Sequence, residues 1–202
     1  MFDYKEYMMA FVRAFFLTLS VSFVSFSVSA APLDELFEQL RDSALDYEIV
    51  GTVCEQVARI ELYKTYPPAK FEIVNGIEYG DNTRTIGELD VVIFEKATKQ
   101  AVLVGEVKCW KDNSAARAKA LDQRQRFVRS LKKNIYLHDH DTDYDKSQFK
   151  NVQKYVSIAP KGSKEAGFEI DMENSLKELM ELRKMMMNCQ HQGQCATATR
   201  GH

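Results

Sequence analysis

Residues 86–110, IGELDVVIFEKATKQAVLVGEVKCW, decide the fold of this chain. Two apolar stretches, 88–94 and 101–109, flank the polar turn EKATKQ, which is typical of two neighbouring strands. Charged side chains interrupt both stretches at Glu88, Asp90, Glu106 and Lys108. Because side chains alternate along a strand, each pair shares one face of its strand. Pairing of the two strands would bring all four side chains together.

Three carboxyl groups and one ammonium at one place on a sheet indicate a chemical site. A buried carboxylate is costly unless a cation balances it, and adjacent carboxylates repel, so the cluster favours a bound metal ion or a proton. Oxygen ligands suit Mg²⁺, or Mn²⁺ in its place. A lysine beside the metal can hold a water molecule or a phosphate oxygen, so these parts predict hydrolysis of a phosphodiester. The alternative is an ordinary charged ladder on a half-exposed sheet, in which Asp90 only pairs with Lys108.

The rest of the chain predicts the elements around these strands. Apolar spacing of the helical period predicts a helix within residues 32–66, which Pro67-Pro68 ends, and a strand at 70–80 has a turn near Asn75-Gly76. Further along we expect a basic helix at 114–134 with Ser114 near its N-cap, a polar loop at 138–150, a strand at 154–160 and a helix at 172–188. This order predicts an α/β fold in which helices flank a small mixed sheet.

The 202 residues are enough for one domain, but the first thirty differ from the rest. The uncharged apolar run 14–26 follows Arg13 and precedes Val28-Ser29-Ala30, which is the pattern of a secretory signal. We therefore expect a signal peptide at 1–30 cleaved after Ala30, a domain at 31–185 and a polar, cysteine-containing tail at 186–202. The mature chain would be secreted or periplasmic, without a membrane span. The alternatives for 1–30 are an uncleaved membrane anchor or a buried helix.

The four cysteines permit disulfides in an exported protein. Cys189 and Cys195 lie close together in the polar tail and could close a small loop. Alternatively, Cys189, Cys195, His191 and His202 could be metal ligands, although their spacing matches no zinc pattern. Cys54 and Cys109 lie in apolar settings, and we expect them to be buried thiols.

The motifs GELD at 87–90 and EVK at 106–108 resemble the core of the PD-(D/E)xK nuclease superfamily. The preceding helix supplies Gly51, Glu55, Ala58 and Leu62. Their spacing, G-x-x-x-E-x-x-A-x-x-x-L, is similar to that of the YraN-like, Holliday-junction-resolvase-like branch. The resemblance covers residues 51–108 and implies a restriction-endonuclease-like core.

The same resemblance implies a role for each charged residue. Asp90 and Glu106 would ligate the metal with help from the Val107 carbonyl, and Lys108 would be the catalytic lysine. Glu55 would orient a metal-bound water or a second ion, and Glu88 would be a supporting acid. On a helical wheel Glu61 lies nearer the centre of the apolar stripe than Glu55, so Glu61 is the alternative for the helix acid.

The basic helix completes the expected site. Related nucleases often carry a glutamine on this helix, and Gln123 falls on the inner face that Ala120 and Phe127 define. Residues 108–133 carry a local charge of +7, although the whole chain is at −2. Backbone phosphates would be held by Arg117, Lys119, Arg124, Arg126, Arg129, Lys132 and Lys133, unless these only cover a solvated helix exterior. Trp110 could stack on a base or form a wall of the core.

Two functions follow from the sequence. The first is an exported, Mg²⁺-dependent endonuclease acting on DNA, with RNA as the other substrate. The second is a non-catalytic module of the same fold that binds nucleic acid or a protein partner in the cell envelope.

Overall fold

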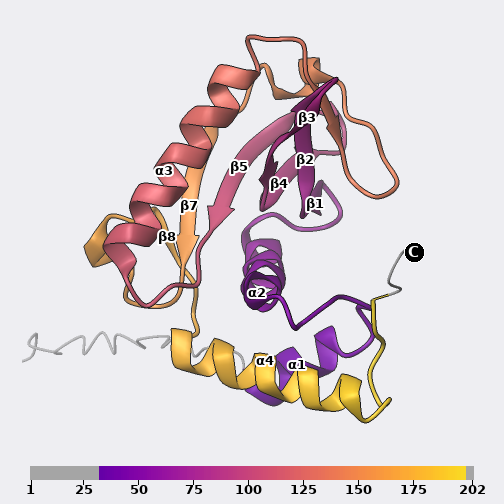
Figure 1. The fold of residues 1–202 in the computed structure, drawn as a ribbon, viewed down its shortest axis with the longest axis vertical. Helices are drawn as coiled ribbons and strands as arrows, with labels where there is room; N and C mark the ends of the chain where they lie inside the picture. The colour runs from indigo at the N-terminus through magenta and orange to yellow at the C-terminus, as the bar shows by residue number, and fades with distance from the viewer. Residues whose placement is uncertain (1–31, 199–202) are drawn as a thin grey trace, which may run out of the picture.

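The computed structural model describes residues 32–198, so the expected signal peptide and its cleavage site lie outside the described residues. At its centre is a five-stranded mixed sheet in the order β1-β4-β5-β7-β8 (Figure 1). The strands are β1 Phe71–Val74, β4 Val91–Glu95, β5 Ala101–Val107, β7 Lys154–Ala159 and β8 Ile170–Asp171. β1, β4 and β5 pair antiparallel, β7 runs parallel to β5, and β8 runs parallel to β7. The expected small mixed sheet is confirmed.

A smaller antiparallel sheet in the order β3-β2-β6 stands beside the first. Its strands are β2 Ile77–Asp81, β3 Arg84–Leu89 and β6 Tyr136–His138. The turn from β1 into β2 lies at Asn75-Gly76, as the sequence predicts. Gly76 has a φ of 77° there, a backbone conformation that glycine adopts without steric cost.

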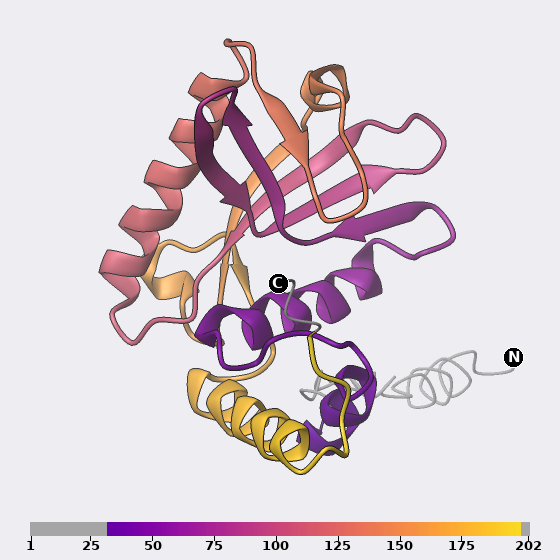
Figure 2. The same cartoon turned by 45° about the vertical axis from the view of Figure 1, so that its right-hand side comes forward.

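Helices cover both faces of the central sheet (Figures 1 and 2). On one face lie α1 Leu33–Leu40, α2 Val50–Thr65 and α4 Leu176–His191, and on the other lie α3 Asn113–Ser130 and the three-stranded sheet. Short 3-10 helices span Lys146–Phe149 and Lys164–Ala166. Among residues 32–198, no helix is both long enough and apolar enough to cross a membrane.

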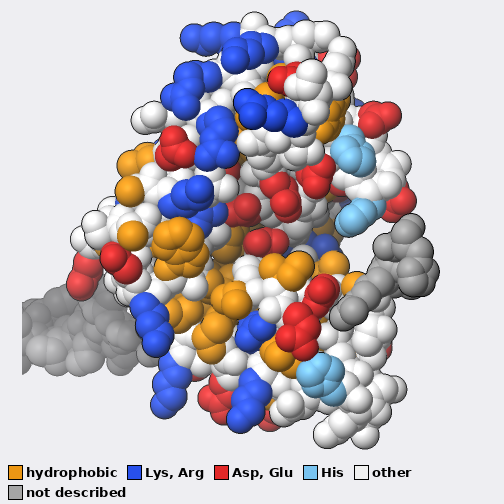
Figure 3. All heavy atoms as spheres, viewed as in Figure 1, with side chains coloured by type: hydrophobic (Ala, Val, Ile, Leu, Met, Phe, Trp, Pro, Cys, Tyr) orange, Lys and Arg blue, Asp and Glu red, His pale blue; other side chains and the backbone are white. Residues whose placement is uncertain are grey.

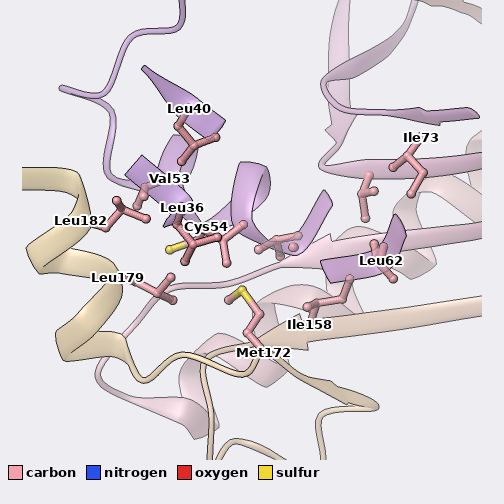
Figure 4. Close-up of a cluster of buried hydrophobic side chains, with 14 of the residues drawn as sticks. Leu36, Leu40, Val53, Cys54, Leu62, Ile73, Ile158, Met172, Leu179 and Leu182 are labelled. Carbon is pink, nitrogen blue, oxygen red and sulfur yellow. The ribbon is translucent and has the colours of Figure 1, made fainter. Parts of the chain in front are cut away.

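Alternation along the central strands builds a hydrophobic core on each face. Val91 and Ile93 of β4 pack into the core beneath α2, whereas Val92 and Phe94 pack into the core beneath the three-stranded sheet. Burial on both faces explains the unbroken apolar run of β4. The first core gathers side chains from α1, α2 and α4 and from β1, β4, β5 and β7. Figure 4 shows part of it, with Leu36, Val53, Cys54, Ile158, Met172, Leu179 and Leu182 among the labelled side chains.

The expected first helix is two helices, α1 and α2, separated by the loop 41–49. Local hydrogen bonds stabilise this loop: the Ser43 and Tyr47 hydroxyls lie 2.9 Å apart, and the Asp46 carboxylate accepts from the Glu48 N–H at 2.9 Å. Ala44 has a φ of 53°, which no helix interior allows. The break lets α1 pack on α4 while α2 packs on the sheet.

The expected strand 88–94 is also divided. The chain bends at Asp90, so that β3 before it belongs to the three-stranded sheet and β4 after it to the five-stranded sheet. The alternation predicted that Glu88 and Asp90 share one face of a single strand, and this prediction is wrong because the two residues belong to different segments. Asp90 instead occupies the junction between the two sheets.

The start of α3 and the end of α4 differ from the sequence prediction. The N-cap of α3 is Asp112 rather than Ser114, and its carboxylate accepts from the Ala115 N–H at 3.0 Å. Residue 186, where we expected the tail to begin, lies inside α4, which continues to His191 and buries Met186. The disulfide between Cys189 and Cys195 is confirmed, which excludes these thiols as metal ligands.

Candidate active site

The pairing of β4 with β5 places the candidate site at the junction of the two sheets. Val91 pairs with Gly105 in the antiparallel register, so Asp90 and Glu106 lie side by side at the next position. Lys108 follows the end of β5, and its N–H donates to the Ile158 carbonyl of β7 at 2.9 Å. Backbone pairing with β7 therefore fixes Glu106 and Lys108, and the adjoining register of β4 and β5 places Asp90 beside them.

The Lys108 ammonium holds three oxygen groups at once. Its Nζ lies 2.7 Å from Asp90 Oδ2, 3.3 Å from Glu106 Oε2 and 2.9 Å from the Val107 carbonyl oxygen. Asp90 Oδ2 also accepts from the Val107 N–H at 2.7 Å. Asp90, Glu106 and Lys108 are 8%, 2% and 7% exposed, so solvent screens this cluster poorly.

These three oxygen groups are the ones that the resemblance to the PD-(D/E)xK nucleases implies as metal ligands. They converge on one point, which Lys108 Nζ occupies, and two carboxylates with one carbonyl form the hard oxygen set that Mg²⁺ prefers. Within residues 32–198 no group of three or more His, Cys, Asp or Glu side chains could hold a metal ion. The residues fit a Mg²⁺ or Mn²⁺ centre in which a backbone carbonyl is the third protein ligand and the ammonium moves aside.

Glu55 of α2 stands beside this cluster. Burial, and then the Asp90 and Glu88 carboxylates, raise the pKa of Glu55 to about 7, and Lys108 partly offsets the effect. A Cβ at Gly51, one helical turn earlier, would lie 2.9 Å from Glu55 Oε1. The missing side chain at Gly51 thus leaves room for the Glu55 carboxylate, which points back toward the start of α2.

Glu61, the alternative helix acid, lies elsewhere. Both of its carboxylate oxygens accept from the Glu173 N–H at 3.0 Å, near β8. Burial is the main cause that raises its pKa to about 7. It borders a cavity of about 500 Å³ between the end of α2 and β8. Glu55, and not Glu61, is the helix carboxylate beside Asp90.

The carboxyl groups of the cluster repel one another. Burial raises the pKa of Glu106 to about 8, with the Asp90 carboxylate as the next cause, and Lys108 opposes the rise. Burial and the Asp90 and Glu78 carboxylates also raise the pKa of Glu88, which is an exposed residue of β3. The site therefore carries more carboxyl groups than its one ammonium balances, which favours the binding of a cation.

Asn75 is a site residue that the sequence analysis missed. Its Nδ2 donates to the Asp90 carbonyl at 2.7 Å and to the Glu55 carbonyl at 3.4 Å, and so joins α2 to the bend between the sheets. Its Oδ1 is buried without a hydrogen-bond partner among the described residues. The Asn-Gly dipeptide predicted only a turn, and nothing local indicated these long-range hydrogen bonds.

The expectation that Cys54 and Cys109 are buried thiols is wrong, because they form a disulfide. Cys54 directly precedes Glu55, and Cys109 directly follows Lys108. The bridge therefore ties α2 to the end of β5 beside two candidate site residues. Both cysteines sit in apolar sequence, which does not distinguish a buried bridge from buried thiols.

Gln123 lies half-buried on α3, between the buried Ala120 and Phe127, as the helix pattern predicts. Its Oε1 is buried and has no hydrogen-bond partner among residues 32–198. Such an atom is costly unless water or a ligand satisfies it. No side-chain hydrogen bond among residues 32–198 links Gln123 to the other site residues.

The basic residues of α3 divide into groups with different partners. Arg117 and Arg124 pair with Glu169 at 3.0 and 3.2 Å and fasten α3 to the segment before β8. Arg126 pairs with Asp122 at 2.7 Å and donates to the Ile86 carbonyl of β3. No ion pair within the described part of the chain engages the exposed Lys119, Arg129, Lys132 and Lys133.

One face of the molecule is hollowed (Figure 3). Figure 3 shows Asp and Glu side chains gathered in a hollow in the middle of one face, with Lys and Arg side chains above and to the left of it. The carboxylates of such a surface attract a cation, and the neighbouring Lys and Arg side chains attract a polyanion. A polyanion bound by the basic side chains would therefore lie close to a cation held by the carboxylates.

Compared with known proteins, the chain matches no family model, no curated protein and no solved structure.

Proposed function

We propose that this chain is a metal-dependent nuclease, of the PD-(D/E)xK kind, that hydrolyses phosphodiester bonds in nucleic acid, with DNA as the first candidate. One observation carries the proposal: Lys108 Nζ contacts Asp90, Glu106 and the Val107 carbonyl simultaneously. A sheet surface ladder would place these groups in solvent, yet here Asp90, Glu106 and Lys108 are all buried.

Asp90, Glu106 and the Val107 carbonyl would hold the divalent cation. When bound, the cation supplies positive charge for the phosphate and lowers the pKa of a coordinated water. The Lys108 side chain would then turn, so that its ammonium leaves the carboxylates and contacts a phosphate oxygen. There it would neutralise the negative charge that develops in the transition state. Glu55 Oε1 orients the attacking water, and Asn75 holds the Glu55 backbone against that of Asp90.

The basic side chains that lack intramolecular partners would contact the phosphate backbone. Lys119, Arg129, Lys132 and Lys133 are the members of the expected set that fit this role, because Arg117 and Arg124 are engaged by Glu169. Phosphate contacts of this kind make affinity fall steeply with salt.

The disulfides support an exported protein. The described residues contain no free cysteine and two disulfides, and disulfides persist mainly in oxidising compartments. We therefore keep the secreted or periplasmic location as part of the proposal.

The test is a cleavage assay on the purified protein with linear, circular and single-stranded DNA and with RNA, in Mg²⁺ or in EDTA. Metal-dependent cleavage that Lys108→Ala abolishes, and that Lys184→Ala at an exposed position of α4 retains, supports the nuclease. Cleavage that survives Lys108→Ala would refute the assigned site.

One observation favours the non-catalytic alternative. The ammonium already neutralises the point on which the three oxygen groups converge, so Lys108 could serve only to stabilise the junction of the sheets. A folded protein that binds nucleic acid but cleaves none of the four substrates would favour this binding module.

A further inference from the structure

Exposed apolar side chains gather next to the candidate site. Ile49, Val50 and Trp110 are 61%, 48% and 46% exposed, the largest exposures among large apolar side chains of the described residues. Ile49 and Val50 begin α2, and the disulfide of Cys54 joins this helix to Cys109, the residue before Trp110. Figure 3 shows hydrophobic side chains exposed beside the Asp and Glu side chains of the hollow.

Trp110 lies between the candidate catalytic lysine and the basic helix. It follows Lys108 by two positions, the exposed Lys111 comes next, and Asp112 caps the start of α3. The indole is thus exposed in a segment that leads from the cluster through Lys111 to the basic helix. A nucleic-acid base with its phosphates matches both features, because the base can cover the ring while the phosphates pair with the lysines.

A second aromatic ring lies on the three-stranded sheet. Tyr136 of β6 is 38% exposed, and its ring crosses Gly80 so closely that a Cβ there would lie 2.6 Å from ring carbon Cζ. Its hydroxyl lies 3.0 Å from Thr85 Oγ1, which fixes the ring on the sheet. The absence of a side chain at residue 80 leaves the tyrosine flat on the sheet surface.

The sheet face that carries Tyr136 leads to the site. On this face Glu78 of β2 pairs with Glu88 of β3 on one side and with His138 of β6 on the other. Glu88 in turn adjoins Asp90, whose carboxylate raises the pKa of Glu88. One exposed aromatic ring thus lies on the sheet face that continues from Glu88, and the other follows Lys108 by two residues.

We propose that the site takes nucleic acid with unpaired bases, and that Trp110 stacks on a base next to the phosphate at the cluster. This inference rests on the proposed function for the identity of the ligand class. In a duplex, neighbouring base pairs cover the faces of each base, so a ring at the surface finds no face to stack on. In a single strand each base offers a free face, and one stacked base contributes about 1–3 kcal/mol.

The test uses the fact that Trp110 is the single tryptophan of the chain. The full chain is titrated in EDTA, which prevents cleavage, with an oligothymidylate of about 12 nucleotides, the span of a single-strand groove. Its duplex with oligoadenylate serves as the comparison. We expect the single strand to quench Trp110 fluorescence and the duplex to leave it unchanged.

Variants assign the effect to the ring. Binding of a fluorescein-labelled single strand, followed by anisotropy, should weaken about tenfold in Trp110→Leu, as loss of one stacked base requires. Trp110→Phe should recover most of the affinity, and Val128→Ala, which removes another exposed apolar side chain, should change nothing. Circular dichroism confirms that each variant is folded.

The outcomes separate the two proposals. Quenching by the duplex as strong as by the single strand, full affinity in Trp110→Leu, or no quenching by either form would overturn the stacking role. Metal-dependent cleavage together with any of these results would leave the nuclease proposal standing. Quenching specific to the single strand without cleavage would instead refute the nuclease and support a single-strand-binding site.

Discussion

Replacement of Lys108 by methionine tests the coupling between the buried ammonium and the oxygen groups it holds. Methionine keeps an unbranched chain of similar length but has no charge and no donor. The variant loses the contacts to Asp90 Oδ2, Glu106 Oε2 and the Val107 carbonyl. It leaves two carboxyl groups, 8% and 2% exposed, without their cation.

The structure bounds the cost of this change. Removal of one partner from a buried ion pair costs about 3–5 kcal/mol. Glu106, whose pKa is about 8, can remain protonated in neutral solution, and Asp90 Oδ2 keeps its hydrogen bond from the Val107 N–H. Methionine also buries an apolar chain in place of the ammonium. We therefore expect a loss of about 2–3 kcal/mol in the free energy of unfolding, below the full penalty.

Added Mg²⁺ should reverse the loss. Without the ammonium, Asp90, Glu106 and the Val107 carbonyl are free to bind the cation. Each tenfold rise in Mg²⁺ above its dissociation constant should then stabilise the variant by about 1.4 kcal/mol. The unsubstituted protein should gain less, because the cation must first displace the ammonium.

The assay is urea unfolding followed by circular dichroism, in EDTA and at increasing Mg²⁺. Lys119→Met, which removes an exposed lysine of α3, is the matched control and should show neither the loss nor the gain. A Lys108→Met variant as stable as the parent would refute the reasoning about the buried ammonium. A destabilised variant that Mg²⁺ fails to stabilise would refute the metal site.

Three further predictions concern neighbouring residues. Replacing Cys54 and Cys109 by serine removes a disulfide of sequence separation 55, which should lower the free energy of unfolding by about 4 kcal/mol and remove most of the activity. The same change at Cys189 and Cys195, of sequence separation 6, should lower it by about 2 kcal/mol and leave the activity intact. Equal activity in the two double variants would contradict a role of the first disulfide in the site. Gly51→Ala should displace the Glu55 carboxylate and lower the cleavage rate while unfolding midpoints hold or rise, and an unchanged rate would count against Glu55. Because the pKa of Glu61 is raised from 4.5 to about 7, the fold binds its proton more tightly than the unfolded chain, so the contribution of Glu61 to stability is fully present below pH 4.5 and is lost as the pH rises through about 7. Glu61→Gln should remove this contribution to the slope of the urea-midpoint profile, and an unaltered slope would contradict it.

The cluster of Asp90, Glu106 and Lys108 could be predicted from the sequence because it needs only two local rules. Side chains alternate along each strand, and two strands joined by a short turn pair antiparallel. The bend at Asp90 was missed, although the sequence contains a signal for it. Alternation stops at this residue and four apolar residues follow, which marks the change from a strand buried on one face to a strand buried on both.

The disulfide and the long-range hydrogen bonds around the site could not be predicted in the same way. The disulfide of Cys54 with Cys109 and the hydrogen bonds of Asn75 depend on where α2 crosses the end of the sheet, which local periodicity does not determine. The ion pairs of the basic residues of α3 could not be predicted from local sequence either. Helical spacing identifies Arg117 and Arg124 as neighbours, but their engagement by Glu169 depends on a segment far along the chain.

The most direct test of the central claim is the rate of cleavage as a function of Mg²⁺ concentration, measured for the parent protein and Asp90→Asn. Asparagine preserves the shape of the side chain but removes the charge and one oxygen ligand. Asp42→Asn, at a carboxylate with 87% of its side chain exposed, is the matched control. The account predicts rates that saturate with Mg²⁺ in the parent and the control, and that fall at least about 10²-fold in Asp90→Asn, as expected when a transition-state contact is lost. Cleavage at the parent rate by Asp90→Asn, or a rate independent of Mg²⁺, would contradict it.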